Sequence, residues 1–145
     1  MKKWIKISLV LIALFIVVVL LVYHFVINKP HPDYENLKAD YSLSAGDLYQ
    51  QFSADEKKAG QMYNGKVIEI NGVFKAIEKN DSLAVIVFSF KEGVFGDEGI
   101  RCTFLSKFTG KVNQLTKNSD IKIKGYCSSF NDIDVILDKC SLTEN

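Results

Sequence analysis

A glycine in the middle of a strand pattern constrains this chain more than any other feature. Residues 65–77 (GKVIEINGVFKAI) read as a strand, and Gly72 lies near its centre. A central glycine lets a strand bend sharply or bulge, because no Cβ blocks the turn. A bent first strand can pair with neighbours on both sides, as a small closed barrel requires. The sequence therefore predicts a barrel that is organised around this strand.

The segments that follow have the order of a five-stranded OB-fold barrel, in a mainly β protein with some α structure. We predict further strands over residues 83–90, 100–104, 120–127 and 133–140, and a short helix over 106–115 between strands three and four. Residues 91–99 are rich in glycine and predict a loop. Residues 83–90 (LAVIVFSF) are apolar on both faces, so one face points into the barrel and the other needs a separate cover.

A helical preface precedes the barrel and is expected to pack on it. Ser44 can cap a first helix, with Asp47 in the capping-box position. Ser53 can cap a second helical segment that ends near residue 64. The predicted organisation is an N-terminal membrane segment over 1–27, a linker over 28–43, the preface over 44–64 and the barrel over 65–145.

The N-terminal segment predicts a single transmembrane anchor. Residues 7–27 are almost wholly apolar and would rise about 31 Å as a helix, close to the roughly 30 Å hydrocarbon core. Lys2, Lys3 and Lys6 precede this run, which places the N-terminus in the cytoplasm and the remaining chain outside it. A cleaved signal peptide is the alternative, but residues 20–32 lack the small residues of a cleavage site.

Several segments of the chain resemble the tRNA_anti-like family of OB-fold domains. They are SAGDLYQQF, GIRCTF and the C-terminal pair IKIKGYCSSF and DVILDKC, within residues 44–142. The most specific positions are Gly125, Cys127, Asp134, Val135, Leu137 and Cys140. The resemblance implies an OB fold in a bacterial, extracytoplasmic protein, often behind a membrane anchor or signal. It brings no functional residues, so it adds to the fold and the location alone.

Three cysteines lie in the predicted extracytoplasmic domain, where disulfides can persist. Their spacing, with 24 and 12 intervening residues, matches no metal-binding pattern. Cys102 and Cys127 share inward parity, and strand three is expected beside strand five, so a disulfide would join Cys102 to Cys127 and leave Cys140 free. Three buried thiols are the alternative.

The composition argues for a binding module and against an enzyme. Both histidines, His24 and His31, precede the barrel, so no histidine-based catalytic or zinc site is expected there, and we expect no metal or cofactor. Residues 28–145 hold 15 Lys and Arg against 17 Asp and Glu, which makes nucleic acid an unfavoured partner. Haem or metal carriage, as in the haem-chaperone OB domains that this anchored layout resembles, uses a histidine that the barrel lacks.

OB barrels bind through the face of strands two and three and through adjoining loops. On this basis we predict a binding surface for a protein or peptide partner, with the membrane contacted through the N-terminal helix. The candidate binding residues are aromatic or apolar apart from one arginine: Ile86, Phe88, Phe90, Phe95, Arg101, Tyr126 and Phe130. The alternative function is binding of single-stranded nucleic acid or oligosaccharide at the same face, with aromatic rings as stacking platforms.

Overall fold

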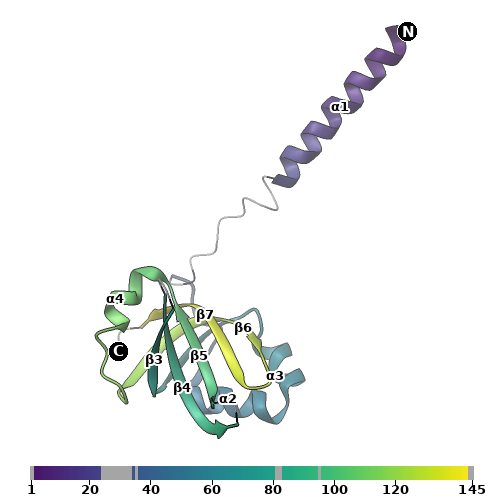
Figure 1. Ribbon diagram of the computed structural model, residues 1–145. Coiled ribbons are helices and arrows are strands. Elements are labelled where there is room, and N and C mark those ends of the chain that lie inside the picture. The colour runs from purple at the N-terminus through teal and green to yellow at the C-terminus, as the bar shows by residue number, and fades with distance from the viewer. Residues whose placement is uncertain (1, 24–33, 35, 81–82, 95, 144–145) are drawn as a thin grey trace. The chain divides into compact units, whose positions relative to one another are not determined.

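A computed structural model describes residues 2–23, 34, 36–80, 83–94 and 96–143 of the chain. Two compact units make up the chain, Met1–Pro32 and Asp33–Asn145. The first unit contains the helix α1 (Lys2–Val22), and the second contains a sheet with three further α-helices (Figure 1). The functional argument below concerns the second unit.

The structure describes the helix α1 over Lys2–Val22, which includes residues 7–22 of the predicted apolar run. No helix in the described ranges is long and apolar enough to cross a membrane. The predicted membrane-spanning helix over 7–27 is therefore not found among the described residues, and residues 24–27 of that prediction lie outside them.

The second unit is organised by one seven-stranded sheet of order β1-β2-β6-β7-β5-β4-β3. Its strands are β1 (Tyr41–Ser44), β2 (Val67–Val73), β3 (Ala76–Asn80), β4 (Leu83–Gly93), β5 (Gly96–Phe104), β6 (Asp120–Phe130) and β7 (Asp134–Leu142). Two pairs, β1 with β2 and β5 with β7, are parallel, and the other neighbours are antiparallel. A mainly β architecture consistent with an OB-like fold is thus confirmed. The predicted closed, five-stranded barrel is corrected, because the described residues form a seven-stranded sheet that ends at β1 and β3 without a ladder that closes it.

The additional strands have two sources. The predicted first strand is divided at Phe74 and Lys75 into β2, which pairs with β6, and β3, which pairs with β4. The Phe74 N–H donates to the Ser119 oxygen at 3.4 Å, whereas the Lys75 N–H donates to the Val87 oxygen at 2.8 Å, so the division lies between them. Within the described residues no backbone hydrogen-bond ladder joins β2 to β3. The two strands are connected only covalently, through Phe74 and Lys75. The second source is β1, which lies in a stretch that the sequence analysis assigned to linker.

In the described part of the second unit, the helices α2, α3 and α4 accompany the sheet (Figure 1). The helix α2 (Ala45–Ala54) begins at Ser44, whose Oγ accepts the Asp47 N–H at 3.0 Å as predicted. The helix α3 (Glu56–Tyr63) is capped by Asp55 and not by Ser53, because the Asp55 carboxylate accepts the Lys58 N–H at 3.0 Å. The predicted helix over 106–115 is shorter in the structure, a 3-10 turn η2 (Ser106–Phe108) followed by α4 (Thr109–Val112). Contacts of α2 with five strands, β1, β2, β4, β5 and β7, bury Leu48 and Phe52.

The structure shows which of the two apolar faces of β4 points into the core. Ala84, Ile86 and Phe88 have no exposed area and belong to the core. The predicted loop over 91–99 is largely a hairpin, since Lys91 pairs with Glu98 and Gly93 with Gly96. Gly96 has a φ of 124°, which an L side chain rarely adopts, so glycine permits this tight turn.

All three cysteines are free and buried. Leu137 of β7 pairs with Cys102 on one side and with Cys127 on the other, so β7 separates the two cysteines. Two strand spacings of about 4.8 Å exceed the roughly 7 Å between Cα atoms that a disulfide spans. The predicted Cys102–Cys127 disulfide is therefore wrong, because β7 lies between β5, which carries Cys102, and β6, which carries Cys127.

Burial of Cys127 predicts an alkaline loss of stability. Desolvation raises the pKa of its thiol from 9.0 to about 12. The unfolded chain releases this proton near pH 9 while the folded chain retains it, so stability is full below pH 9 and falls as the pH rises toward 12. Urea unfolding at pH 8, 9 and 10 should show this fall, and a Cys127→Ala variant should show a smaller one. Equal pH dependence in both proteins would contradict this assignment.

Candidate functional site

The predicted binding residues do not form one surface. Ile86 and Phe88 are core residues without exposed area, so their side chains contribute to no outer surface. Phe95 lies outside the described residues. Phe90 stacks on Tyr49 of α2, with ring centroids 5.3 Å apart. The register shift between Ser89 and Lys91 accompanies the change from the buried Phe88 to the 43% exposed Phe90.

The remaining aromatic candidates pack against other rings. Phe130 stacks on Phe52 of α2 at 5.4 Å between centroids, and Tyr126 of β6 contacts Tyr34 at 5.1 Å. Each of these two rings therefore already contacts an aromatic ring of the protein itself, as a stacking platform for a nucleobase would not. The interactions of Phe90 and Phe130 with α2 show that part of the predicted apolar surface is covered by the protein's own helix.

Arg101 is the one predicted residue at the centre of an outer face. We define the strand face as the side chains of four neighbouring strands that lie on the same side of the sheet as Arg101: Ala76, Glu78, Val85, Arg101, Thr103 and Ile136, with the buried Val87 among them. Arg101 donates through Nε to Asp134 and through Nη1 to Glu78, each at 2.7 Å. The hydrogen bond with Asp134, supported by that with Glu78, raises the pKa of the Arg101 guanidinium. The positive charge of this face is thus neutralised by two carboxylates.

Asp134 connects the strand face to the core and should matter for stability. Its carboxylate is 7% exposed and accepts both the Gly99 N–H at 2.9 Å and Arg101 Nε. Asp134→Ala should lower the free energy of unfolding by about 2–3 kcal/mol, since it leaves a buried N–H unpaired and removes a charged hydrogen bond. Urea unfolding measures this. Glu78→Ala is the control: Glu78 is 53% exposed, so its loss should cost less than about 1 kcal/mol. Equal losses in the two variants would contradict the argument.

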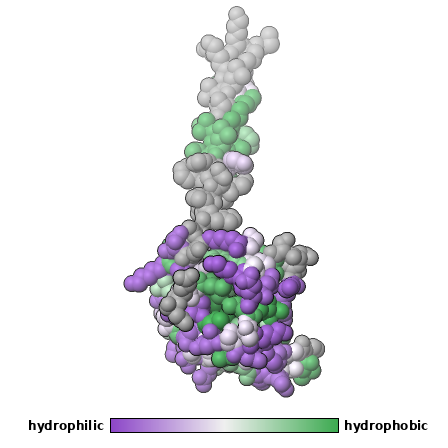
Figure 2. All heavy atoms as spheres, turned by 90° about the vertical axis from the view of Figure 1, so that its left-hand side faces the viewer, coloured by the Kyte–Doolittle hydropathy of each residue, from purple (hydrophilic) through white to green (hydrophobic). Residues whose placement is uncertain are grey.

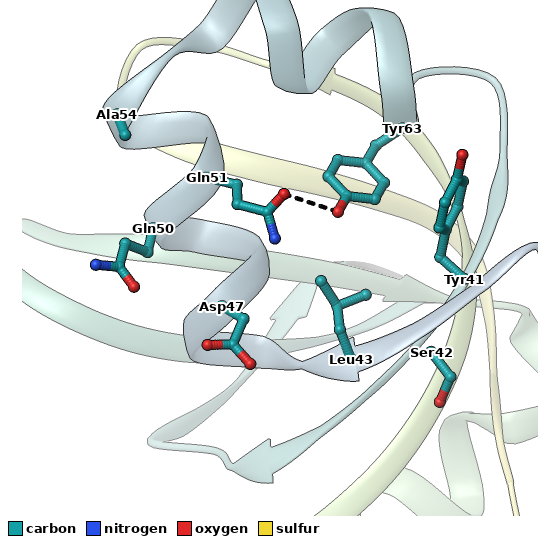
Figure 3. A pocket seen from close by; sticks show the side chains of 8 residues that line it. All are labelled: Tyr41, Ser42, Leu43, Asp47, Gln50, Gln51, Ala54 and Tyr63. Carbon is teal, nitrogen blue, oxygen red and sulfur yellow. Dashed lines mark hydrogen bonds between the residues drawn. The ribbon is translucent and has the colours of Figure 1, made fainter.

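A pocket that the sequence analysis missed lies beside β1 (Figure 3). This pocket, the edge pocket, has a volume of ≈ 490 Å³. It is lined by β1, α2 and α3 through Tyr41, Ser42, Leu43, Asp47, Gln50, Gln51, Ala54 and Tyr63. Tyr63 donates its hydroxyl to Gln51 at 2.8 Å across the pocket, and the Tyr41 ring meets the Tyr63 ring edge-on at 5.0 Å (Figure 3). The sequence offers no distinguishing signal for it, because the four residues 41–44 (YSLS) are too few for alternation to separate a strand from a linker.

The strand β1 is the terminal strand of the sheet and pairs only with β2. Its inner edge is secured, because the Asp40 N–H donates to the Val67 oxygen at 2.8 Å and the Ser42 hydroxyl donates to Glu69 at 3.0 Å. Residues of β2 at even positions bond to β6, so Val67 and Glu69 face β1, and in this parallel register Glu69 bonds to the residues on either side of Ser42. The backbone groups of Ser42 therefore point away from β2. In the described part of the chain no strand lies on that side of β1.

The described residues meet the requirements of a metal site and of a protein interface to different degrees. They contain no group of three His, Cys, Asp or Glu side chains that could hold a metal ion. Hydrophobic residues instead gather on the face seen from the left of Figure 1, with hydrophilic residues around them (Figure 2). An apolar surface with a polar rim is typical of a protein interaction site.

Comparisons with known proteins identify related sequences and folds. The sequence model of the tRNA_anti-like family matches residues 1–142. A lipoprotein from Klebsiella pneumoniae, described as a candidate nucleic acid-binding protein, is similar at 18% identity and a TM-score of 0.56, covering 80% of this chain and 100% of that one. No match was found among curated proteins.

Two further solved structures are similar at a lower level. An aspartyl-tRNA synthetase from Leishmania major has 10% identity and a TM-score of 0.45, covering 81% of this chain and 23% of that one. The Stn1–Ten1 complex of S. pombe has 14% identity and a TM-score of 0.38, with 55% and 59% coverage. At 18% identity, the K. pneumoniae structure shows likeness of fold alone.

Proposed function

We propose, from the premise that this chain belongs to the tRNA_anti-like family, that its folded unit is a binding module whose partner is a polypeptide. The observation that carries this proposal is the charge pairing and the residue composition of the strand face. Arg101 is held by two carboxylates, and none of the residues that define the face is aromatic. A face of this kind offers a nucleic acid neither a free cation for phosphate nor a ring for base stacking.

Single-stranded nucleic acid is the second candidate function. It is favoured by the OB-like fold and by the K. pneumoniae lipoprotein, which is described as a candidate nucleic acid-binding protein. At 18% identity, the similarity to that protein supports a shared fold and does not extend to its ligand. Oligosaccharide binding at the strand face belongs with this second candidate.

A photo-crosslinking experiment separates these partner classes. A photoreactive phenylalanine analogue is placed at Thr103 on the strand face, or at Gln50 beside the edge pocket, in the full chain inside bacterial cells. We expect an adduct that protease destroys and nuclease leaves intact. A nuclease-sensitive adduct would replace the polypeptide proposal with nucleic acid, and an adduct resistant to both enzymes would indicate oligosaccharide.

We also propose that residues 1–32 hold the binding module at a membrane, with the folded unit outside the cytoplasm. The support is the basic N-terminus followed by an apolar helix, in which side chains such as Leu14 and Phe15 are exposed by 62% and 69%. The full chain should remain in the membrane pellet after alkaline carbonate extraction, whereas a chain without residues 1–32 should be released. Release of both would exclude attachment by this segment.

A further inference from the structure

We propose that a groove beside α2, the hairpin groove, binds a segment of the polypeptide partner in which a lysine or arginine lies close to an apolar residue. The hairpin groove consists of two adjoining pockets, the cation pocket and the apolar pocket. Their described lining residues belong neither to the strand face nor to the edge pocket. This inference rests on the proposed function, because it names the surface and the chemistry that would recognise a polypeptide partner.

The cation pocket has aromatic walls. Its volume is ≈ 340 Å³, and its lining includes Tyr49, Glu56, Lys91, Glu98, Phe130 and Asp132. Tyr49 stacks on Phe90 of β4 with ring centroids 5.3 Å apart, and Phe130 stacks on Phe52 of α2 at 5.4 Å. Each ring is held by its partner before any ligand arrives, so it offers a preformed surface to which a cation is attracted.

The charges of the cation pocket favour a positively charged group. Three acids, Glu56, Glu98 and Asp132, line it against one lysine, Lys91. Lys91 donates to Glu98 at 3.0 Å, so an ammonium group already lies beside that carboxylate. Within the described chain no ion pair engages Glu56 or Asp132, and both residues are exposed. These two carboxylates can therefore receive a further cation without displacing one of the protein's own.

The apolar pocket adjoins the cation pocket, because Glu98 lines both. Its volume is ≈ 280 Å³, and Gly93, Val94 and Ile133 are part of its lining, from the tip of the β4–β5 hairpin and the turn before β7. Val94 is 95% exposed and Ile133 is 36% exposed. Ile133 directly follows Asp132 of the cation pocket in the chain. An apolar group of a partner that covered Val94 and Ile133 would remove their surface from water, which stabilises a complex.

The two pockets together favour a polypeptide over other occupants. A free polyamine would meet the carboxylates but would leave the apolar pocket unfilled. The three acids would repel an anionic lipid surface or a nucleic acid. A second copy of the chain that used the same groove would bring identical acids together. In an extended polypeptide, alternate side chains lie on one side about 7 Å apart, so a basic and an apolar residue can enter adjoining pockets.

Selection from a phage-displayed library of random heptapeptides tests the inference without assuming a register. The full chain is immobilised in a nonionic detergent, and peptides that bind the detergent-coated support alone are removed first. The enriched peptides should carry a lysine or arginine within two positions of a leucine, isoleucine, valine or phenylalanine at least fivefold more often than the unselected library. Enrichment of peptides without this pairing, or no enrichment, would overturn the inference.

Two substitutions that each remove one carboxylate test the cation pocket with a selected peptide, whose affinity is measured by fluorescence anisotropy. Asp132→Asn changes a lining residue, and asparagine tolerates the φ of 69° at this position. Glu92→Gln changes an exposed residue of β4 that is not part of either lining. The peptide should bind Asp132→Asn at least fivefold more weakly than the unmodified chain, and Glu92→Gln less than twofold more weakly. Equal losses would mean a general attraction by negative charge and would overturn the cation pocket.

A second pair tests the apolar pocket. Val94→Ser should weaken binding of the same peptide at least fivefold, whereas Val73→Ser, at a valine of β2 that is 58% exposed, should weaken it less than twofold. Both variants should remain folded by circular dichroism, since both side chains are exposed. Equal binding by the two variants would overturn the apolar pocket. Loss of binding in Thr103→Asp in place of Val94→Ser would move the partner to the strand face and leave the polypeptide function standing, whereas a nuclease-sensitive crosslink would remove that function itself.

Discussion

Phe88→Asp should leave the second unit without a cooperatively folded state. Phe88 has no exposed area and lies in the core beneath Gly72, where a Cβ would be 3.7 Å from its ring. Removal of a buried phenylalanine costs about 3–5 kcal/mol. A carboxylate without a partner at the same place adds several kcal/mol. The sum is comparable with the total stability of a domain, which is about 5–15 kcal/mol.

Phe90→Asp is the matched control, two residues along the same strand. Phe90 is 43% exposed, so its carboxylate substitute can remain in water. The loss of its stacking on Tyr49 should cost about 1 kcal/mol. Far-UV circular dichroism with urea unfolding should show a sharp transition for Phe90→Asp and none for Phe88→Asp. Similar transitions in both variants would contradict the placement of Phe88 in the core.

Most of the strands were predictable, because all of them except β1 have a local signal in the sequence. Gly72 predicted a bent first strand, and the two halves of that strand do pair with different neighbours. The Ser44 cap was predictable from residues three positions apart. The hairpin over residues 91–99 was not predictable, because glycine is common both in loops and in tight turns such as the one closed by the pair Gly93 and Gly96.

The face assignment of β4 could not be made from the sequence. Both parities of residues 83–90 are apolar, so alternation carries no information about which set is internal. Only the pairing of Ile86 with Ile77 and Cys102, in a core completed by α2, decides it. The choice of Ile86 and Phe88 as binding residues failed for this reason, whereas Arg101, a charged residue, could be placed outside.

The edge pocket was missed because it depends on contacts between distant segments. The strand β1 has four residues and becomes a strand by pairing with β2, 27 positions later in the chain at Tyr41 and Ile68. No periodicity over so short a stretch would distinguish it from linker. The predicted pairing of Cys102 with Cys127 was wrong for a similar reason. The alternation of residues along a strand shows that a side chain points inward, but it does not show that another strand lies between two cysteines.

Gly99→Ala should be the most damaging substitution among the glycines of the sheet. A Cβ at Gly99 would collide with the Phe88 carbonyl oxygen and would lie 3.2 Å from the Ser89 Cα. These are backbone atoms of β4, so relief would require β4 and β5 to separate. The free energy of unfolding should fall by about 4 kcal/mol or more. Urea unfolding of the full chain measures it, and a loss below about 1 kcal/mol would contradict the close approach of the two strands.

Gly110→Ala is the control for replacing a glycine as such. No atom lies within 4 Å of a Cβ at Gly110, which is in α4. Alanine favours helix over glycine, so this variant should be more stable by up to about 1 kcal/mol. The opposite signs of the two substitutions would show that the contact with Phe88, and not a general effect of alanine, determines the loss at Gly99.

The damage at Gly99 should also reach the strand face, because the Gly99 N–H is one of the two groups that hold the Asp134 carboxylate. Displacing β5 removes that hydrogen bond, so part of the loss expected for Asp134→Ala is already present in Gly99→Ala. The two substitutions should therefore be less than additive when combined, by about 1 kcal/mol or more. Full additivity in a double-mutant cycle would mean that Gly99 and Asp134 stabilise the sheet independently, and that Arg101 alone positions the carboxylate.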